Sequence, residues 1–206
     1  MRCTRLCSTL MLLALFLLSC SSGTDTLQQP LPGTLPALQG EWVNMVVEIP
    51  AGTNKKIEYD KASGQFRADQ RNGADRIIDF LPYPGNYGFI PGTALPVADG
   101  GDGDAVDVLL ISESLPTGTQ IVVRPVGALR LLDEGQVDVK VIAIPADSAL
   151  QVISPADFTD FSIRYDGARH LIESWFLQYD GLGAHQLQGW VDEERALAFI
   201  KASVAE

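Results

Sequence analysis

Basic residues, cysteines and long apolar runs are all scarce in this chain of 206 residues. It has three cysteines and two histidines, and its 15 Lys and Arg face 26 Asp and Glu, for a formal net charge of −11. The shortage of basic residues argues against a nucleic-acid partner, because affinity for phosphate backbones comes largely from Lys and Arg. Hydrophobic residues still make up 46% of the chain, which excludes wholesale disorder. The length predicts one medium-sized folded domain.

An apolar run from Leu10 to Leu18 follows Arg2 and Arg5 and precedes small residues. Its nine residues are too few to span a bilayer, which needs about 20, so the layout is that of a secretory signal. The ending at Leu17 to Cys20 resembles a bacterial lipobox, in which the cysteine is acylated and begins the mature chain. We therefore expect a lipoprotein signal peptide at 1–19, a lipid on Cys20 and export to the bacterial cell envelope, on the periplasmic side. An ordinary signal peptide with a chance cysteine is the alternative.

Removal of the signal would also remove Cys3 and Cys7, so the mature chain could form no internal disulfide. Residues 20–40 are rich in Ser, Thr, Gln, Gly and Pro, and Pro30, Pro32 and Pro36 oppose helix formation. We interpret this segment as a flexible tether between a membrane anchor and the domain, which we expect at 41–206.

The remainder of the chain alternates short β-rich stretches with Gly, Pro and Asp clusters, a pattern typical of a β-barrel. Two helices are expected near the end, at Ala168 to Tyr179 and Asp192 to Ala205, where apolar residues recur at helical spacing. The strands are expected at Glu41 to Ile49, Ile57 to Tyr59, Gln65 to Ala68, Arg76 to Phe80, Val106 to Ile111, Gln120 to Val126 and Val137 to Ile144.

Three carboxylates lie close together where a loop enters an apolar strand, at Asp102, Asp104 and Asp107. Carboxylates this crowded repel one another and are stabilised by a cation. A solvated acidic loop is one alternative and an EF-hand is another. The EF-hand fails because Val106 stands where an oxygen ligand is expected and Asp107 where the turn needs Gly.

A second acidic cluster contains Asp133, Asp138 and Lys140, and the last two share one face of a strand because they are two residues apart. A hairpin with charged ends would produce a similar pattern. Glu48, and the pair Lys56 and Glu58, add charge to other strand-like stretches. Together these acids and lysines indicate a multinuclear Mg²⁺ site that holds a polyanion.

At this point the sequence resembles a known family, the family I soluble inorganic pyrophosphatases. The resemblance covers about Val43 to Ala205 and rests on ordered motifs. The motifs are Glu48-Ile49-Pro50, Lys56, Glu58, Tyr83 to Ile90 with its Asn-Tyr-Gly, Gly101 to Leu109 with its three aspartates, Arg124 to Gly127, Asp133 to Lys140, Tyr179 and Gly189-Trp190.

The resemblance implies a mainly β fold of the α+β class, a distorted five-stranded OB-type closed barrel with two C-terminal helices packed on it. It also implies hydrolysis of pyrophosphate to two phosphates by a metal-activated water, with several Mg²⁺ ions or other divalent cations. The implied metal residues are Asp102, Asp107, Asp138, Asp133, Glu48 and Glu58. The implied catalytic residues are Asp104 as the base for the attacking water, with Lys56, Arg76, Tyr87, Tyr179 and Lys140 around the phosphates.

Two positions depart from the family pattern. Arg76 lies seven residues before Tyr83, where the family usually has an arginine eight before, so Arg76 is the predicted phosphate ligand and Arg71 the alternative. Asp180 stands where the family usually has a lysine, which should weaken phosphate binding. A divalent-cation or phosphate-binding lipoprotein with weakened or lost catalysis is therefore the alternative function. An OB-type binder of oligonucleotides or oligosaccharides fits poorly because the site is acidic. A homo-oligomer is left open.

Overall fold

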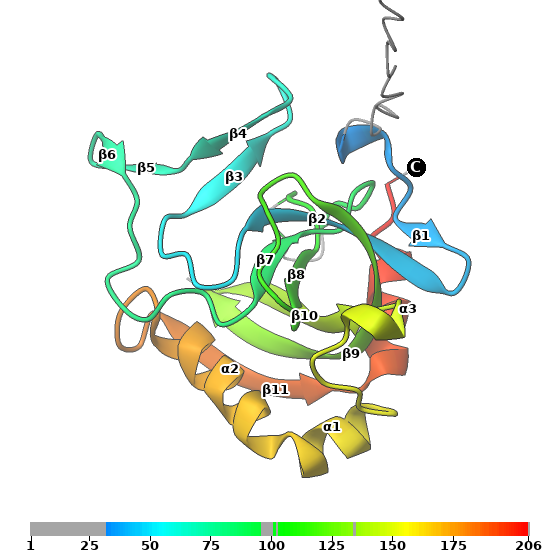
Figure 1. Cartoon of the computed structure of the whole chain (residues 1–206). Coiled ribbons are helices and arrows are strands. Elements are labelled where there is room, and N and C mark those ends of the chain that lie inside the picture. The colour runs from blue at the N-terminus through cyan, green and yellow to red at the C-terminus, as the bar shows by residue number, and fades with distance from the viewer. Residues whose placement is uncertain (1–31, 96–100, 102, 134, 206) are drawn as a thin grey trace, which may run out of the picture.

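Five strands close into a ring in the computed structural model, which describes residues 32–95, 101, 103–133 and 135–205 (Figure 1). Around the ring each strand pairs with the next, and β9 returns to β2 to close it. The pair β8–β10 is parallel and the other pairs are antiparallel. The ring strands are β2 (Trp42–Ile49), β7 (Asn86–Phe89), β8 (Asp107–Leu110), β10 (Gln136–Pro145) and β9 (Gln120–Asp133). The predicted five-stranded barrel is confirmed.

Further short elements extend the ring. Strand β1 (Leu38–Gln39) pairs with β2, and β11 (His185–Val191) pairs with β9. Two hairpins stand beside the barrel at the upper left of Figure 1. They are β3 (Ile57–Asp60) with β4 (Gln65–Ala68), and β5 (Gln70–Arg71) with β6 (Ala74–Asp75). Single 3-10 turns occur at Pro32–Thr34 and Ser148–Leu150.

The long strand β9 bends where it passes Pro125 and Gly127. Its pairing with β10 shifts register there, so β9 can pair with β2 before the shift and with β11 after it. A side chain at Gly127 would meet the Phe158 ring and the Val191 carbonyl at less than 3 Å. Proline is tolerated at such a bulge. The predicted Arg-Pro-Val-Gly motif is therefore the corner that closes the barrel.

The core has two parts. One fills the barrel and extends to α3, with Met45, Val108 and Ile200 among its buried side chains. The other lies between the barrel and α2 and includes Trp175 and Phe176, which are 2% and 1% exposed. Successive side chains along a strand point to opposite faces, so neighbouring residues such as Val108 and Leu109 pack into different parts of the core.

Three helices occur in the described part of the chain, whereas two were predicted. They are α1 (Phe158–Arg164), α2 (Asp166–Gln178) and α3 (Glu193–Ala202). Helix α1 has only seven residues, too few for its periodicity to stand out in the sequence. Its N-cap is Asp157, whose side chain accepts a hydrogen bond from the Asp160 backbone, and Asp192 caps α3 in the same way.

Other local predictions differ from the structure. Residues 76–80 form no regular strand; Ile77 makes only a single bridge to Lys55, and both Ile77 and Phe80 are exposed. The domain also begins before residue 41, because Ala37 is buried and Leu38 pairs with Val43. The predicted tether therefore extends too far toward the barrel.

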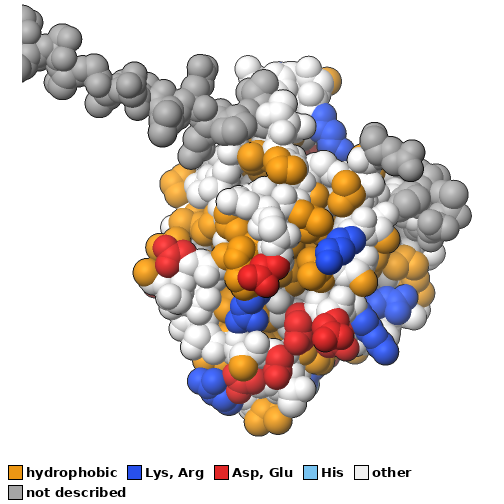
Figure 2. Space-filling view, turned by 90° about the vertical axis from the view of Figure 1, so that its right-hand side faces the viewer, with side chains coloured by type: hydrophobic (Ala, Val, Ile, Leu, Met, Phe, Trp, Pro, Cys, Tyr) orange, Lys and Arg blue, Asp and Glu red, His pale blue; other side chains and the backbone are white. Residues whose placement is uncertain are grey.

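The surface that carries α3 mixes acidic and basic side chains over its lower half, with hydrophobic side chains scattered among them (Figure 2). None of the helices in the described ranges combines the length and apolar character that crossing a membrane requires. The predicted signal peptide at 1–19, the predicted lipidation site Cys20 and the start of the predicted tether lie outside the described residues.

Candidate active site

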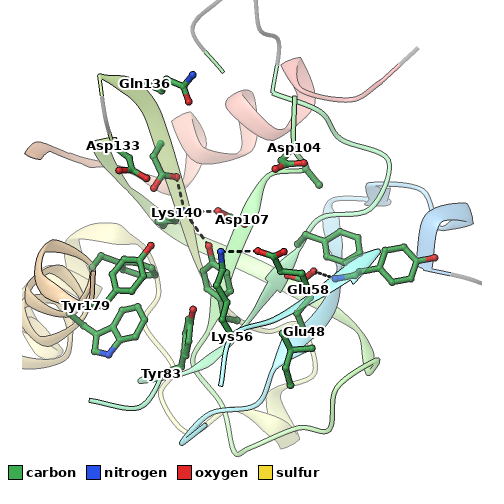
Figure 3. Close-up of a pocket in the computed structure, with 18 of the residues that line it drawn as sticks. Glu48, Lys56, Glu58, Tyr83, Asp104, Asp107, Asp133, Gln136, Lys140 and Tyr179 are labelled. Atoms are coloured by element: carbon green, nitrogen blue, oxygen red, sulfur yellow. Dashed lines mark hydrogen bonds and ion pairs between the residues drawn. The ribbon is translucent and has the colours of Figure 1, made fainter. Parts of the chain in front are cut away.

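A polar pocket of about 280 Å³ opens where β2, β3, β8, β10 and α2 meet. Figure 3 shows Tyr83 and Tyr179 on one side, Glu48 and Glu58 on the other, and Asp107 with Lys140 between them. Of the described residues, six carboxylates and three lysines line this pocket. They are Glu48, Glu58, Asp104, Asp107, Asp133 and Asp138, with Lys56, Lys61 and Lys140.

Lys140 is the buried centre of the site. Parallel pairing of β8 with β10 sets Lys140 opposite Asp107, and Asp138 lies two residues earlier on the same face. Lys140 Nζ is 2.5 Å from Asp107 Oδ2 and 2.7 Å from Asp138 Oδ1, and it donates to Tyr87 Oη at 3.1 Å. Although burial disfavours its charge, the two carboxylates outweigh burial and raise the pKa of Lys140. Lys140 therefore stays cationic between two anions.

Glu48 enters the pocket at an irregularity in β2, where pairing with β7 shifts between Val47 and Ile49. Its Oε1 accepts a hydrogen bond from the Tyr59 backbone at 2.7 Å. Burial raises the pKa of Glu48 to about 8, and Asp107 and Glu58 act in the same direction. A cation bound beside a carboxyl group whose pKa is raised in this way stabilises its ionised form, so Glu48 is suited to a cation site.

The Asn-Tyr-Gly motif on β7 positions Tyr87, which lines the pocket. A side chain at Gly88 would lie 1.9 Å from the Val46 carbonyl oxygen, so only glycine permits the close approach of β2. Asn86 is fully buried, and its Oδ1 accepts from the backbone N–H groups of Ala51 and Leu115. These contacts fix the turn after β2 next to Tyr87.

The aromatic wall presents hydroxyl groups to the pocket. Trp175 stacks on Tyr179 with ring centroids 4.7 Å apart and packs at a tilt against Tyr83 with centroids 4.5 Å apart. Its Nε1 donates a hydrogen bond to the Leu81 carbonyl. Burial raises the pKa of Tyr179 to about 12 and also raises the pKa of Tyr87. These hydroxyls are therefore protonated at neutral pH and can donate hydrogen bonds to an anion.

The rim carries more accessible groups. The Asp104 side chain is 80% exposed and lies 3.9 Å from Lys61 Nζ. Lys56 pairs with Glu58 at 2.8 Å. Asp133 lies 3.6 Å from His185 Nε2, a buried imidazole whose two ring nitrogens have no hydrogen-bond partner among the described residues. Asp102, predicted as a metal ligand, lies outside the described residues.

Among the predicted site residues that the structure describes, Arg76 alone does not line the pocket. Its guanidinium bonds to Asp69 at 3.2 Å and to Asp180 at 3.0 Å. Asp180 also binds Arg71, with Arg71 Nη1 2.9 Å from Asp180 Oδ1. Arg71 and Arg76, the two candidate phosphate ligands, therefore both bind the carboxylate of Asp180 next to the pocket.

The pocket fits divalent cations by the chemistry of its donors. Carboxylate oxygens are the ligands that Mg²⁺ and similar hard cations prefer, and acids here outnumber lysines. Within the described ranges, no three Asp, Glu, His or Cys residues already form a metal-sized cluster. At the centre of the pocket, Lys140 lies between Asp107 and Asp138 and contacts both carboxylates.

The structure therefore brings together most of the residues predicted from the sequence. Ten of the twelve predicted catalytic and metal residues line one pocket, namely Glu48, Lys56, Glu58, Tyr87, Asp104, Asp107, Asp133, Asp138, Lys140 and Tyr179. Sequence reasoning gave no role to Tyr83, Lys61, Gln136 or Trp175, which also line it. Trp175 lies in the segment Ala168 to Tyr179, whose apolar spacing predicts a helix but carries no signal for a pocket wall.

The pocket beside this small closed barrel brings together acids, lysines and tyrosine hydroxyls. Such a set of groups defines a class of site that binds divalent cations together with a polyanion. The family model for inorganic pyrophosphatase matches residues 45–206 of this chain. The chain belongs to the inorganic pyrophosphatase family, as the resemblance indicated. Enzymes of this family generally depend on divalent metal ions.

Individual relatives agree with this assignment. The chain is 35% identical over 176 residues to an inorganic pyrophosphatase of Neisseria meningitidis, covering 81% of this chain and 89% of the relative. The crystal structure of the Thermus thermophilus inorganic pyrophosphatase superposes with a TM-score of 0.69 at 32% identity, covering 85% of this chain and 97% of that one. A truncated Trypanosoma cruzi vacuolar soluble pyrophosphatase in complex with PPi gives a TM-score of 0.72 at 26% identity, covering 82% and 70%.

Proposed function

We propose that this protein hydrolyses inorganic pyrophosphate to two phosphates with Mg²⁺ ions. The observation that carries the proposal is the convergence of six carboxylates, three lysines and protonated tyrosine hydroxyls on one pocket in a chain of this family. A pyrophosphate ion carries up to four negative charges, so both the lysines and bound cations are needed to hold it among carboxylates.

Different side chains of the protein would carry out different parts of the reaction. Asp104, accessible at the rim, would orient the attacking water and accept its proton as the water oxygen bonds to phosphorus and the bridging P–O bond breaks. The departing phosphate keeps the bridging oxygen. Lys56 and the hydroxyls of Tyr87 and Tyr179 would bind phosphate oxygens, and Lys140 would hold Asp107 in place.

Asp107, Asp138, Asp133, Glu48 and Glu58 would hold the ions, together with Asp102. When bound, such ions neutralise charge on phosphate oxygens and lower the pKa of coordinated water. Mg²⁺ is the proposed ion because all these ligands are oxygens and Mg²⁺ commonly binds through one or two carboxylates and substrate phosphates.

The alternative of a binding protein that lost catalysis is less well supported. Its motivation was Asp180, but Asp180 contacts Arg71 and Arg76 outside the pocket, so it can act on phosphate only through these arginines and leaves the residues that would hold the ions in place. The carboxylates and lysines around Asp107 are all present.

A substrate panel tests the proposed chemistry. The purified full-length protein with Mg²⁺ should release phosphate from pyrophosphate much faster than from p-nitrophenyl phosphate, because the site is built for two adjoining phosphates. Equal rates on both substrates would contradict a pyrophosphatase and indicate a general phosphatase.

We further propose that the protein is a lipoprotein of the bacterial cell envelope, because Leu17 to Cys20 resembles a lipobox after an apolar run. In a bacterial host, the Cys20→Ser variant should leave the membrane fraction and keep its hydrolytic activity. The measurement is fractionation with immunodetection, combined with mass spectrometry of the N-terminus. An unmodified Cys20 in the wild type would contradict the proposal.

A further inference from the structure

Two arginines from the hairpin region meet one carboxylate at the end of α2, and we call this group the arginine clasp (Arg71, Arg76 and Asp180). Arg71 binds Asp180 through two hydrogen bonds, of 2.9 and 3.1 Å, and Arg76 Nη2 binds Asp180 Oδ2 at 3.0 Å. In Figure 1 the chain leaving β6 passes beside the loop that follows α2, and the hydrogen bond from Arg76 to Asp180 connects these two segments.

The clasp adjoins the pocket. Asp180 directly follows Tyr179, whose ring lines the pocket wall. Arg76 also binds Asp69, and Asp69 lies 3.8 Å from the pocket-lining Lys56. Burial is the main cause of the raised pKa of Tyr179, and Arg76 opposes it, so the Arg76 charge acts on that hydroxyl.

Asp180 is an unfavourable residue for the helix itself. It follows the C-cap of α2, where the carbonyl groups carry partial negative charge and favour cations. Hydrogen bonding from Arg71, with help from Arg76, lowers the pKa of Asp180, so its carboxylate stays ionised at neutral pH. The arginines, not the helix, stabilise this charge.

The arginines can bind another anion in place of Asp180. Guanidinium groups bind carboxylates and phosphates through the same planar pair of donors, so the two anions compete. The Arg76 side chain is only 12% exposed, and its Nε has no hydrogen-bond partner among the described residues. Arg76 therefore retains a donor that its carboxylate partners leave unused.

We propose that Asp180 sets the affinity of the pocket for phosphate-bearing anions by competing for Arg71 and Arg76. This inference rests on the proposed function and adds to it a positioning residue that acts through the two arginines. Asp180 lowers affinity in the free protein because an incoming phosphate must displace it or share a guanidinium with it.

Binding of methylenediphosphonate, which the enzyme cannot hydrolyse, tests the proposal by calorimetry at fixed Mg²⁺. The Asp180→Asn variant should bind it about three- to tenfold more tightly than the wild type, which corresponds to about 0.7 to 1.4 kcal/mol. The Asp180→Glu variant retains the carboxylate and should stay close to the wild type. Asp180→Ser repeats the test if the Asn variant folds poorly.

The matched control is Asp75→Asn. Asp75 lies in the same hairpin region and pairs with Lys55 at 2.7 Å, so its neutralisation changes the net charge equally without freeing Arg71 or Arg76. In kinetics with pyrophosphate, Asp180→Asn should lower KM by a similar factor with kcat changed less than twofold, a split that general destabilisation would not produce.

Each other outcome has a definite meaning. If Asp180→Asn binds no more tightly than Asp75→Asn, the clasp does not compete with phosphate and the proposal fails. Weaker binding by Asp180→Asn also overturns it, because Asp180 would then hold the arginines in their productive position. If no variant binds or hydrolyses a diphosphate, the proposed function fails and this inference fails with it.

Discussion

The Asp107→Asn variant is expected to lose turnover by about a thousandfold or more. Asp107 begins β8 at the centre of the pocket, 2.5 Å from Lys140, and it is one of the carboxylates that would hold the cations. Loss of several kcal/mol of charge stabilisation corresponds to about three decades in rate. The measurement is phosphate release from pyrophosphate at saturating Mg²⁺, with Mg²⁺ binding followed in parallel.

The variant should remain folded, because Lys140 keeps Asp138 at 2.7 Å as a counterion. Asp166→Asn is the control, since Asp166 lies on α2 with its side chain 51% exposed and should leave the rate unchanged. A rate for Asp107→Asn within a few-fold of the wild type would contradict the role of Asp107 in holding the ions.

The Lys140→Met variant should lower the free energy of unfolding by about 3–5 kcal/mol in the absence of divalent ions. Lys140 has a side chain only 7% exposed, and its removal leaves the partly buried Asp107 and Asp138 without this counterion. Added Mg²⁺ should restore more stability to this variant than to the wild type, because cations can replace the lost ammonium. Urea denaturation with and without Mg²⁺ measures both effects.

Lys55→Met is the matched control for that experiment. The Lys55–Asp75 ion pair has the same length as Lys140–Asp138, 2.7 Å, but it is exposed to solvent, so its loss should have a much smaller effect. If the two variants are equally stable, Lys140 does not compensate the central carboxylates.

The sequence predicted those parts of the site that depend on local spacing. Asp138 and Lys140 were placed on one face because they are two residues apart, and the structure joins them. The neighbour of Lys140 across the sheet is Asp107, 33 residues away, and only the parallel register of β8 and β10 brings them together. The family resemblance supplied that association before any register was known.

The sequence could not predict the partners of Asp180. Arg71 and Arg76 lie 109 and 104 residues from it along the chain, and neither hairpin nor helix periodicity relates them. Comparison with the family pattern marked Asp180 as a departure and assigned Arg76 to phosphate. The structure instead shows that Arg76 and Asp180, the two residues that depart from the family pattern, contact each other.

Short elements were the weakest part of the fold prediction. Strand β7 has four residues, all buried, so it lacks the alternation that marks a half-buried strand. Strand β11 is interrupted by a register shift between Leu187 and Gly189, and α1 is barely two turns long. The position of β7 depends on pairing with β2 and β8, and the positions of β11 and α1 depend on contacts with β9 and α2. A linear sequence pattern contains none of these contacts.

Phosphate release from pyrophosphate by the purified full-length protein tests the central claim most directly. With Mg²⁺ the account predicts two phosphates for each pyrophosphate consumed, loss of release when a chelator removes the ions, and recovery when Mg²⁺ is returned in excess. The Asp107→Asn protein, assayed alongside at equal concentration, should stay inactive throughout. Binding of pyrophosphate by a folded, Mg²⁺-loaded protein without any release of phosphate would contradict the account.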